Sequence, residues 1–120
     1  IDNTISFTDK IRSSLKSDKV EVNHAFLLSS PRVCDVWDDW ERECRETKTA
    51  ATELLIIPMF PQYSESTIAS GIDGLFKNIE HRVHIPPFKV MTNFHRSRAF
   101  IDNSVIMIEE WLKSFKSSGN

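Results

Sequence analysis

The sequence is poor in the residues that build several kinds of site. Its two cysteines, Cys34 and Cys44, lie too far apart for a disulfide if one helix carries both, and they belong to no cluster with zinc spacing. Three glycines form no phosphate-binding loop. No apolar run approaches the roughly 20 residues that span a bilayer, and a net charge of -2 gives no basic surface for nucleic acid. These absences exclude a zinc module, a nucleotide-binding loop, a membrane-spanning helix and a nucleic-acid binder.

Hydrophobic periods typical of helices and of strands alternate along the 120 residues. The predicted helices cover residues 7–15, 31–47, 68–79 and 98–115, and the predicted strands cover residues 20–28, 53–59 and 88–92. Strands that alternate with helices are typical of βαβ units and a parallel sheet. The sequence therefore predicts an α/β fold, a Rossmann-like three-layer half-domain whose short parallel sheet of about three strands is flanked by helices. We expect a single domain over residues 1–120, with a polar tail at residues 116–120.

Two further structural predictions follow from the same pattern. Ser30 is expected to cap the helix that opens at Pro31, and Ser66 or Thr67 the helix after the second strand. The last helix is expected to face the core with one apolar stripe. The stripe consists of Ile101, Val105, Ile108, Leu112 and Phe115.

Residues 54–67 carry the most specific pattern in the chain. They read Leu-Leu-Ile-Ile-Pro-Met-Phe-Pro-Gln-Tyr-Ser-Glu-Ser-Thr. This segment resembles the ferrochelatase signature, an apolar strand followed by Pro-Leu-Tyr-Pro-Gln-Tyr/Phe-Ser-x-x-Thr, from which it departs conservatively at Met59 and Phe60. The resemblance implies a chelatase-like fold, corresponding to part of the first of two similar lobes. It also implies a relation to haem biosynthesis, in which the family inserts ferrous iron into porphyrin.

The resemblance assigns a porphyrin-binding loop beyond the carboxyl end of the second strand, where open α/β sheets bind their ligands. The assigned residues are Pro61, Gln62, Tyr63, Ser64, Ser66 and Thr67. Backbone N–H groups at a helix start and the nearby hydroxyls suit a porphyrin propionate, and Tyr63 offers an aromatic face. In the alternative interpretation, Ser66 or Thr67 only caps the helix and Tyr63 packs in the core.

Several positions depart from the family pattern. Asp2–Asn3 stand near the place of a Gly-Ser-Pro motif, Leu27–Leu28 where members often have an Arg-Tyr pair, and Glu65 where some have an iron–sulfur cysteine. Ser97 and Arg98 stand where many members have histidine. The first-lobe Asn-Leu-Gly-Thr-Pro motif and the second-lobe His-Gly-x-Pro motif have no counterpart. We therefore predict no catalytic residue, no metal ligand and no iron–sulfur cluster, with porphyrin or haem and ferrous iron as ligands only if the family activity is retained.

The histidines and acidic residues give weaker signals. His81 and His84 could share a metal only on a helix, and Pro86 predicts a loop there. His24, on an apolar face, is interpreted as a core residue, and His95 lies about two residues off the family register. The second helix carries an acidic face, interpreted as solvated, and two tryptophans interpreted as core. These residues are Asp35, Asp38, Asp39, Glu41, Glu43, Trp37 and Trp40.

Three functions fit these observations. The substituted positions favour a ferrochelatase-like domain that is non-catalytic on its own and serves as an accessory or structural subunit, a pseudoenzyme in a larger assembly. The intact Pro-Gln-Tyr-Ser loop favours the alternative, a fragment of an active ferrochelatase. A small class II chelatase working as a homodimer is the third, although its metal histidines have no clear counterpart.

The expected partners are other chains of a larger complex or a missing second chelatase lobe, with no nucleic acid and no transmembrane segment. The expected location is the matrix side of mitochondria, since a start at Ile1 fits a removed presequence. The bacterial cytoplasm is the alternative.

Overall fold

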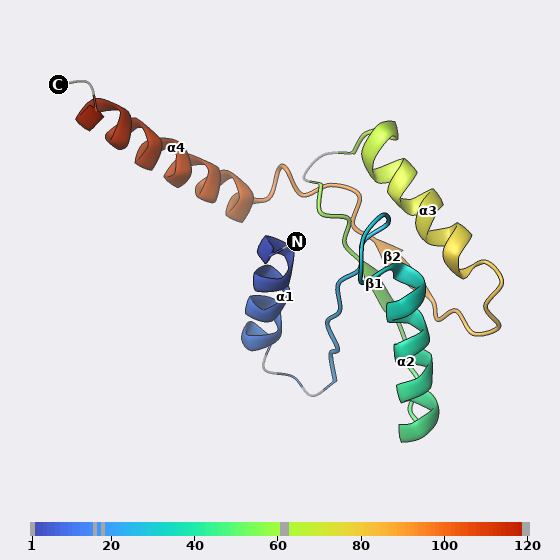
Figure 1. The fold of residues 1–120 in the computed structure, drawn as a ribbon. Coiled ribbons are helices and arrows are strands. Elements are labelled where there is room, and N and C mark those ends of the chain that lie inside the picture. The colour runs from blue at the N-terminus through green and yellow to red at the C-terminus, as the bar shows by residue number, and fades with distance from the viewer. Residues whose placement is uncertain (1, 16, 18, 61–62, 119–120) are drawn as a thin grey trace. The chain divides into compact units, whose positions relative to one another are not determined.

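A computed structural model describes residues 2–15, 17, 19–60 and 63–118, and it has the α/β character that the sequence predicts (Figure 1). In chain order the elements are α1 (Asp2–Ser14), α2 (Val33–Thr47), β1 (Leu54–Ile56), the π-helical turn η1 (Glu65–Ala69), α3 (Ser70–Ile79), β2 (Phe88–Val90) and α4 (Arg98–Ser118). The two strands form a parallel sheet, and helices precede and follow each of them in the sequence. The predicted chelatase-like class, with a short parallel sheet and helices, is confirmed.

The chain divides into two compact units that alternate along the sequence. One unit contains Ile1–Glu53 and Asp73–Pro87, and the other contains Leu54–Ile72 and Phe88–Asn120. The sheet and α4 belong to the second unit, whereas α1 and α2 belong to the first. The prediction of a single domain over residues 1–120 stays a prediction.

The sheet brings two loops to one edge. Leu54 pairs with Phe88 and Ile56 with Val90, and the Met91 N–H extends the pairing by donating to the Ile56 carbonyl at 2.9 Å. Because the strands are parallel, their carboxyl ends lie at the same edge, so the loops that lead to η1 and to α4 both leave the sheet there. We call this edge the carboxyl edge; it comprises residues 57–60, 63–67 and 91–98, which are the described loop residues and the helix starts that follow them.

The prediction of a strand over residues 20–28 is wrong. This segment is irregular apart from one isolated parallel bridge between Phe26 and Arg32, where the Phe26 N–H donates to the Pro31 carbonyl at 2.8 Å. Upstream, the Val22 carbonyl accepts a hydrogen bond from Arg12 Nε at 2.7 Å instead of from a neighbouring strand. An apolar pattern does not by itself form a ladder, because strand formation depends on partners and packing. The described residues therefore form a two-stranded sheet rather than one of about three strands.

Helix α2 begins later than the sequence predicts. Its N-cap is Arg32 rather than Ser30, and the Arg32 N–H donates to the Asp35 carboxylate at 3.2 Å. The acidic residue in the first turn thus takes the role that was expected of the serine hydroxyl. The helix ends at Thr47 as predicted, where Lys48 adopts a left-handed conformation with φ 54°.

The acidic face of α2 is partly engaged rather than wholly solvated. The Arg82 guanidinium pairs with Asp38 and, at 3.2 Å, with Glu41, which also accepts a hydrogen bond from Trp37 Nε1 at 3.1 Å. The hydrogen bond to Asp38 raises the pKa of Arg82 further above its ordinary value. Trp37 is buried, as predicted, and the Arg82 side chain is 15% exposed. This network joins the segment after α3 to α2.

Replacing Arg82 with methionine should lower the melting temperature by a few degrees, because the network loses its only cation while two carboxylates remain. Because folding raises the pKa of Arg82, its ion pairs stabilise the folded state at every pH below the ordinary arginine pKa. This stabilisation is lost only as the pH rises through the raised pKa. The difference in melting temperature between wild type and variant should therefore be constant around neutral pH and should become smaller at high salt. A difference that disappears at pH 7 would contradict this role. Lys113→Met on α4 is the matched control.

Helix α4 exposes the stripe that was expected to face the core. Ile101 is 49% exposed, Ile108 57% and Phe115 65%. Within its unit, in the part of the chain that the structure describes, α4 packs against no other helix or strand. The inward orientation predicted for this stripe is therefore wrong, because an apolar face is buried only where another element covers it. The helix continues to Ser118 and so includes residues 116–118 of the predicted polar tail, while residues 119–120 lie outside the described residues.

Candidate functional site

The residues assigned to porphyrin binding lie at the carboxyl edge of the sheet. Tyr63 and Ser64 precede η1, and Ser66 and Thr67 lie within it. Pro61 and Gln62, which belong to the same assignment, lie outside the described residues. The sheet therefore places the described part of the loop where open α/β folds bind their ligands.

Three hydroxyl groups at this edge contact one another, and we call Ser64, Ser66 and Thr67 the hydroxyl cluster. Ser64 Oγ lies 2.5 Å from Thr67 Oγ1 and 3.3 Å from Ser66 Oγ. The turn is fixed by the backbone, since the Ala69 N–H donates to the Ser64 carbonyl at 3.2 Å. Two contacts use two of the three hydroxyl hydrogens, so one remains for an acceptor outside the cluster.

The alternative interpretation, in which Ser66 or Thr67 caps the helix, is wrong. The N-cap of η1 is Ser64, and its side chain makes no capping hydrogen bond to the backbone. Ser66 and Thr67 lie inside the turn, because the helix begins with Glu65, earlier than the apolar period predicts. Tyr63 is 49% exposed, so the alternative of a core tyrosine is also wrong and its ring is accessible. The described geometry is compatible with a binding loop, and the assignment to porphyrin stays a prediction.

The second loop of the carboxyl edge is a tight turn that begins α4. The Ser97 N–H donates to the Phe94 carbonyl at 3.0 Å, and the rings of Phe94 and Phe100 meet edge to face with centroids 5.8 Å apart. Ser97 Oγ accepts a hydrogen bond from the Phe100 N–H at 3.2 Å and thereby caps α4. His95 and Arg96 occupy the turn between them; His95 Nδ1 is buried and has no hydrogen-bond partner among the described residues.

No motif in the sequence predicts a role for Arg96, and Ser97 is predicted only as a substituted position. A serine directly before a helical period is a capping signal that would have identified Ser97. Arg98, in contrast, has a 94% exposed side chain, and its Nε lies 3.6 Å from the Asp102 carboxylate. The positions where many family members have histidine therefore hold a helix cap and an exposed guanidinium.

The other altered positions are exposed. Leu27 is 44% exposed and Leu28 93%, so neither side chain takes the place of a buried polar group. Asp2 and Asn3 begin α1 and are exposed. Glu65 is exposed at the start of η1 in the second unit.

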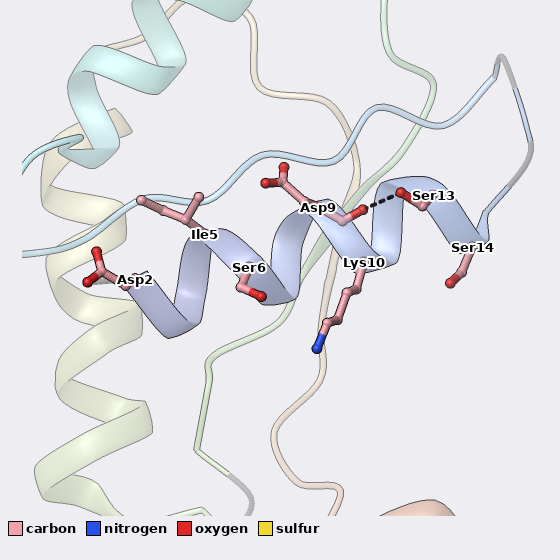
Figure 2. A pocket seen from close by; sticks show the side chains of 7 residues that line it. All are labelled: Asp2, Ile5, Ser6, Asp9, Lys10, Ser13 and Ser14. Atoms are coloured by element: carbon pink, nitrogen blue, oxygen red, sulfur yellow. Dashed lines mark hydrogen bonds between the residues drawn. The ribbon is translucent and has the colours of Figure 1, made fainter.

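A shallow hollow runs along α1, and its lining side chains come from successive turns of that one helix (Figure 2). Ser13 Oγ donates to the Asp9 carbonyl at 2.8 Å, so the hydrogen of this hydroxyl is used within α1. The lining residues are Asp2, Ile5, Ser6, Asp9, Lys10, Ser13 and Ser14. One helix face does not provide the convergent ligands that a cation requires. We therefore assign no site to this hollow.

The described residues contain no group of three or more histidine, cysteine or acidic side chains arranged to hold a metal ion. His81 and His84 follow α3 in a turn and an irregular segment, as predicted. His24 is half-buried against the edge of Phe26, although its buried Nδ1 finds no partner there. Cys34 and Cys44 are both free. No described helix is long and apolar enough to cross a membrane.

Comparisons with known proteins agree with the pattern in the loop. The family model described as ferrochelatase matches residues 1–120. A ferrochelatase of Idiomarina loihiensis is 29% identical over 93 residues, which are 78% of this chain and 24% of that protein. A ferrochelatase of Marinobacter nauticus is 28% identical over 109 residues, 88% of this chain and 28% of that protein.

A coproporphyrin III ferrochelatase of Streptococcus mutans is 27% identical over 82 residues, which are 68% of this chain and 24% of that protein. The chain thus spans about a quarter of the length of these curated relatives. No solved structure matches it.

Proposed function

The chain belongs to the ferrochelatase family, and on that premise we propose that it binds a porphyrin at the carboxyl edge and does not insert a metal by itself. Its relatives bear the names ferrochelatase and coproporphyrin III ferrochelatase, and the segment shares about a quarter of their length. The proposed ligand is therefore a porphyrin that carries carboxylate groups. Ferrous iron would be the second substrate of the complete enzyme.

The hydroxyl cluster is the observation that carries this proposal. Ser64 holds Ser66 and Thr67 within hydrogen-bond distance, and one hydroxyl hydrogen remains for a carboxylate oxygen. The first N–H groups of a helix have no partner inside the helix and favour an anion at the same place. The exposed ring of Tyr63 adds an aromatic surface beside these donors, which suits a flat macrocycle.

Metal insertion requires a group that takes up the pyrrole protons and ligands that deliver the metal. At the positions where many members have histidine, Ser97 caps α4 and Arg98 carries a permanent positive charge. Neither side chain is suited to accept a proton or to bind a cation. We propose that these groups come from polypeptide outside this segment, as in a fragment of an active ferrochelatase.

A second candidate is the accessory subunit, a non-catalytic relative that serves a larger assembly. The substitution of the histidine positions by Ser97 and Arg98 favours it, since a missing segment would not explain changes inside the matched region. The proposed location for that assembly is the matrix side of mitochondria. The mass of the native particle separates the candidates: a complex of several different chains supports the subunit, and a single longer chain supports the fragment.

The function itself is tested with mesoporphyrin, a porphyrin with two propionates. We expect micromolar mesoporphyrin to quench the fluorescence of the three tryptophans, and we expect the Soret band to stay that of the free porphyrin after ferrous iron or zinc is added. Absence of quenching would contradict porphyrin binding. A metalloporphyrin spectrum formed faster than in buffer would contradict the non-catalytic half of the proposal.

A further inference from the structure

We propose that Arg96 and Arg98 make the carboxyl edge selective for the carboxylate groups of its ligand. The inference rests on the proposed porphyrin-binding function and identifies the side chains that would recognise the porphyrin periphery. It concerns a loop that lies outside the Pro-Gln-Tyr-Ser segment, and it depends on the parallel pairing of β1 with β2.

The topology brings the two arginines to the same edge as the hydroxyl cluster. Ile56 and Val90 are register partners at the ends of their strands, and the Met91 N–H still bonds to the Ile56 carbonyl at 2.9 Å. From these partners one loop leads to Ser64 and the other to Arg96. Both loops belong to the same compact unit of the chain.

Hydrogen bonds and a ring contact hold the turn that carries Arg96, and both arginines are exposed. The hydrogen bond from Ser97 to Phe94, the Phe94–Phe100 ring contact and the Ser97 cap fix the backbone on both sides of Arg96. Arg96 is exposed, and Arg98 is 94% exposed at the side chain. Arg98 forms an exposed ion pair with Asp102 at 3.6 Å from Nε, which is longer than a hydrogen bond, so its N–H donors can still reach a ligand.

Arg96 and Arg98 are the cationic side chains of the described part of this edge. The described loops and the first residue of each following helix carry Arg96, Arg98 and Glu65, and Asp102, one turn into α4, pairs with Arg98. The buried Nδ1 of His95, without a partner among the described residues, adds one more polar atom to this turn. Two exposed guanidinium groups give this edge charged donors for an anionic ligand.

The chemistry of the edge fits a ring that carries carboxylates. Guanidinium groups bind carboxylates through two parallel hydrogen bonds, which a lysine does not reproduce. The hydroxyl cluster can donate to another carboxylate oxygen, and Tyr63 can lie against the apolar ring. A porphyrin with free propionates meets all these groups, and its methyl ester loses the two charge-assisted contacts.

The test uses the complete chain and two ligands, mesoporphyrin and mesoporphyrin dimethyl ester, titrated in the same buffer and followed by tryptophan quenching. In Arg96→Ala/Arg98→Ala the affinity for mesoporphyrin should fall about tenfold or more, since a charge-assisted hydrogen bond contributes more than a neutral one. The affinity for the ester should not change, and added salt should weaken only mesoporphyrin binding. Arg42→Ala/Arg45→Ala, two exposed arginines of α2, should behave as wild type.

Arg96→Ala alone and Arg96→Lys/Arg98→Lys cover the case in which the double alanine variant does not fold. The single variant should lose part of the affinity, and the lysine variant should retain salt dependence with weaker binding. If wild type binds mesoporphyrin and all these variants bind it equally, the selectivity assigned to the arginines is overturned and porphyrin binding stands. If wild type binds neither ligand, the proposed function fails, and the inference fails with it.

Discussion

Replacing Ile68 with alanine is expected to lower the free energy of unfolding by about 3 kcal/mol. Ile68 is fully buried in η1, between the hydroxyl cluster and α3, and it is one of the few core side chains of the described chain. Truncation of a buried isoleucine removes its transfer free energy and leaves a cavity, which together cost about 2–5 kcal/mol. Urea denaturation followed by circular dichroism measures the change.

Leu55→Ala in β1 is the matched control for Ile68→Ala. Leu55 belongs to the same unit and is 55% exposed, so the loss of its side chain should cost less than about 1 kcal/mol. Equal losses for the two variants would show that η1 does not anchor the unit. Because Ile68 adjoins Thr67, the buried variant should also weaken mesoporphyrin binding, whereas Leu55→Ala should not.

The second large effect is expected at Ser64, the centre of the hydroxyl cluster. Ser64 Oγ is the atom that both Ser66 Oγ and Thr67 Oγ1 contact, so Ser64→Ala removes both contacts at once. We expect mesoporphyrin affinity to fall about tenfold, the size expected when one good hydrogen bond to an anion is lost. Fluorescence titration measures the affinity.

Ser64→Ala should lower the free energy of unfolding by at most about 1–2 kcal/mol, because its side chain bonds to two neighbouring hydroxyls and makes no capping hydrogen bond to the backbone. Ser13→Ala on α1 is the control, as it removes an exposed hydroxyl that bonds only to the Asp9 carbonyl. Wild-type affinity in Ser64→Ala would remove the hydroxyl cluster from the binding site. Lower affinity in both variants would indicate a general effect on folding.

The presence of each helix was predictable from the sequence, because the apolar period is a local property, although α1 begins at Asp2 rather than at the predicted residue 7. The ends of α2 and the start of α4 were placed within about two residues. The extent of the sheet was not predictable, since residues 20–28 have a strand pattern and no ladder, and pairing depends on a partner elsewhere in the chain. The exposure of the α4 stripe was missed for the same reason.

The candidate site divides in the same way. The motif identified the loop at Tyr63 and Ser64, because several residues at fixed spacing make a specific pattern. It did not show which hydroxyl is central, because that depends on the early start of η1. No sequence pattern identified Arg96, because a single arginine in a loop belongs to no motif. Its proposed role follows only from the parallel pairing of β1 and β2, which brings its loop to the same sheet edge as the loop after β1.

Each of the two compact units is built from two separate stretches of the chain, and this affects how the protein unfolds. Helix α3 crosses from one unit to the other, with Ile72 in the second and Asp73 in the first, inside a single run of helical hydrogen bonds. No contiguous stretch of polypeptide corresponds to either unit, so neither a protease nor a truncation can release one of them intact. Opening one end of α3 disturbs the other end, because helix formation is cooperative. Thermal unfolding should therefore be a single transition, and hydrogen exchange in both units should slow together when α3 is stabilised.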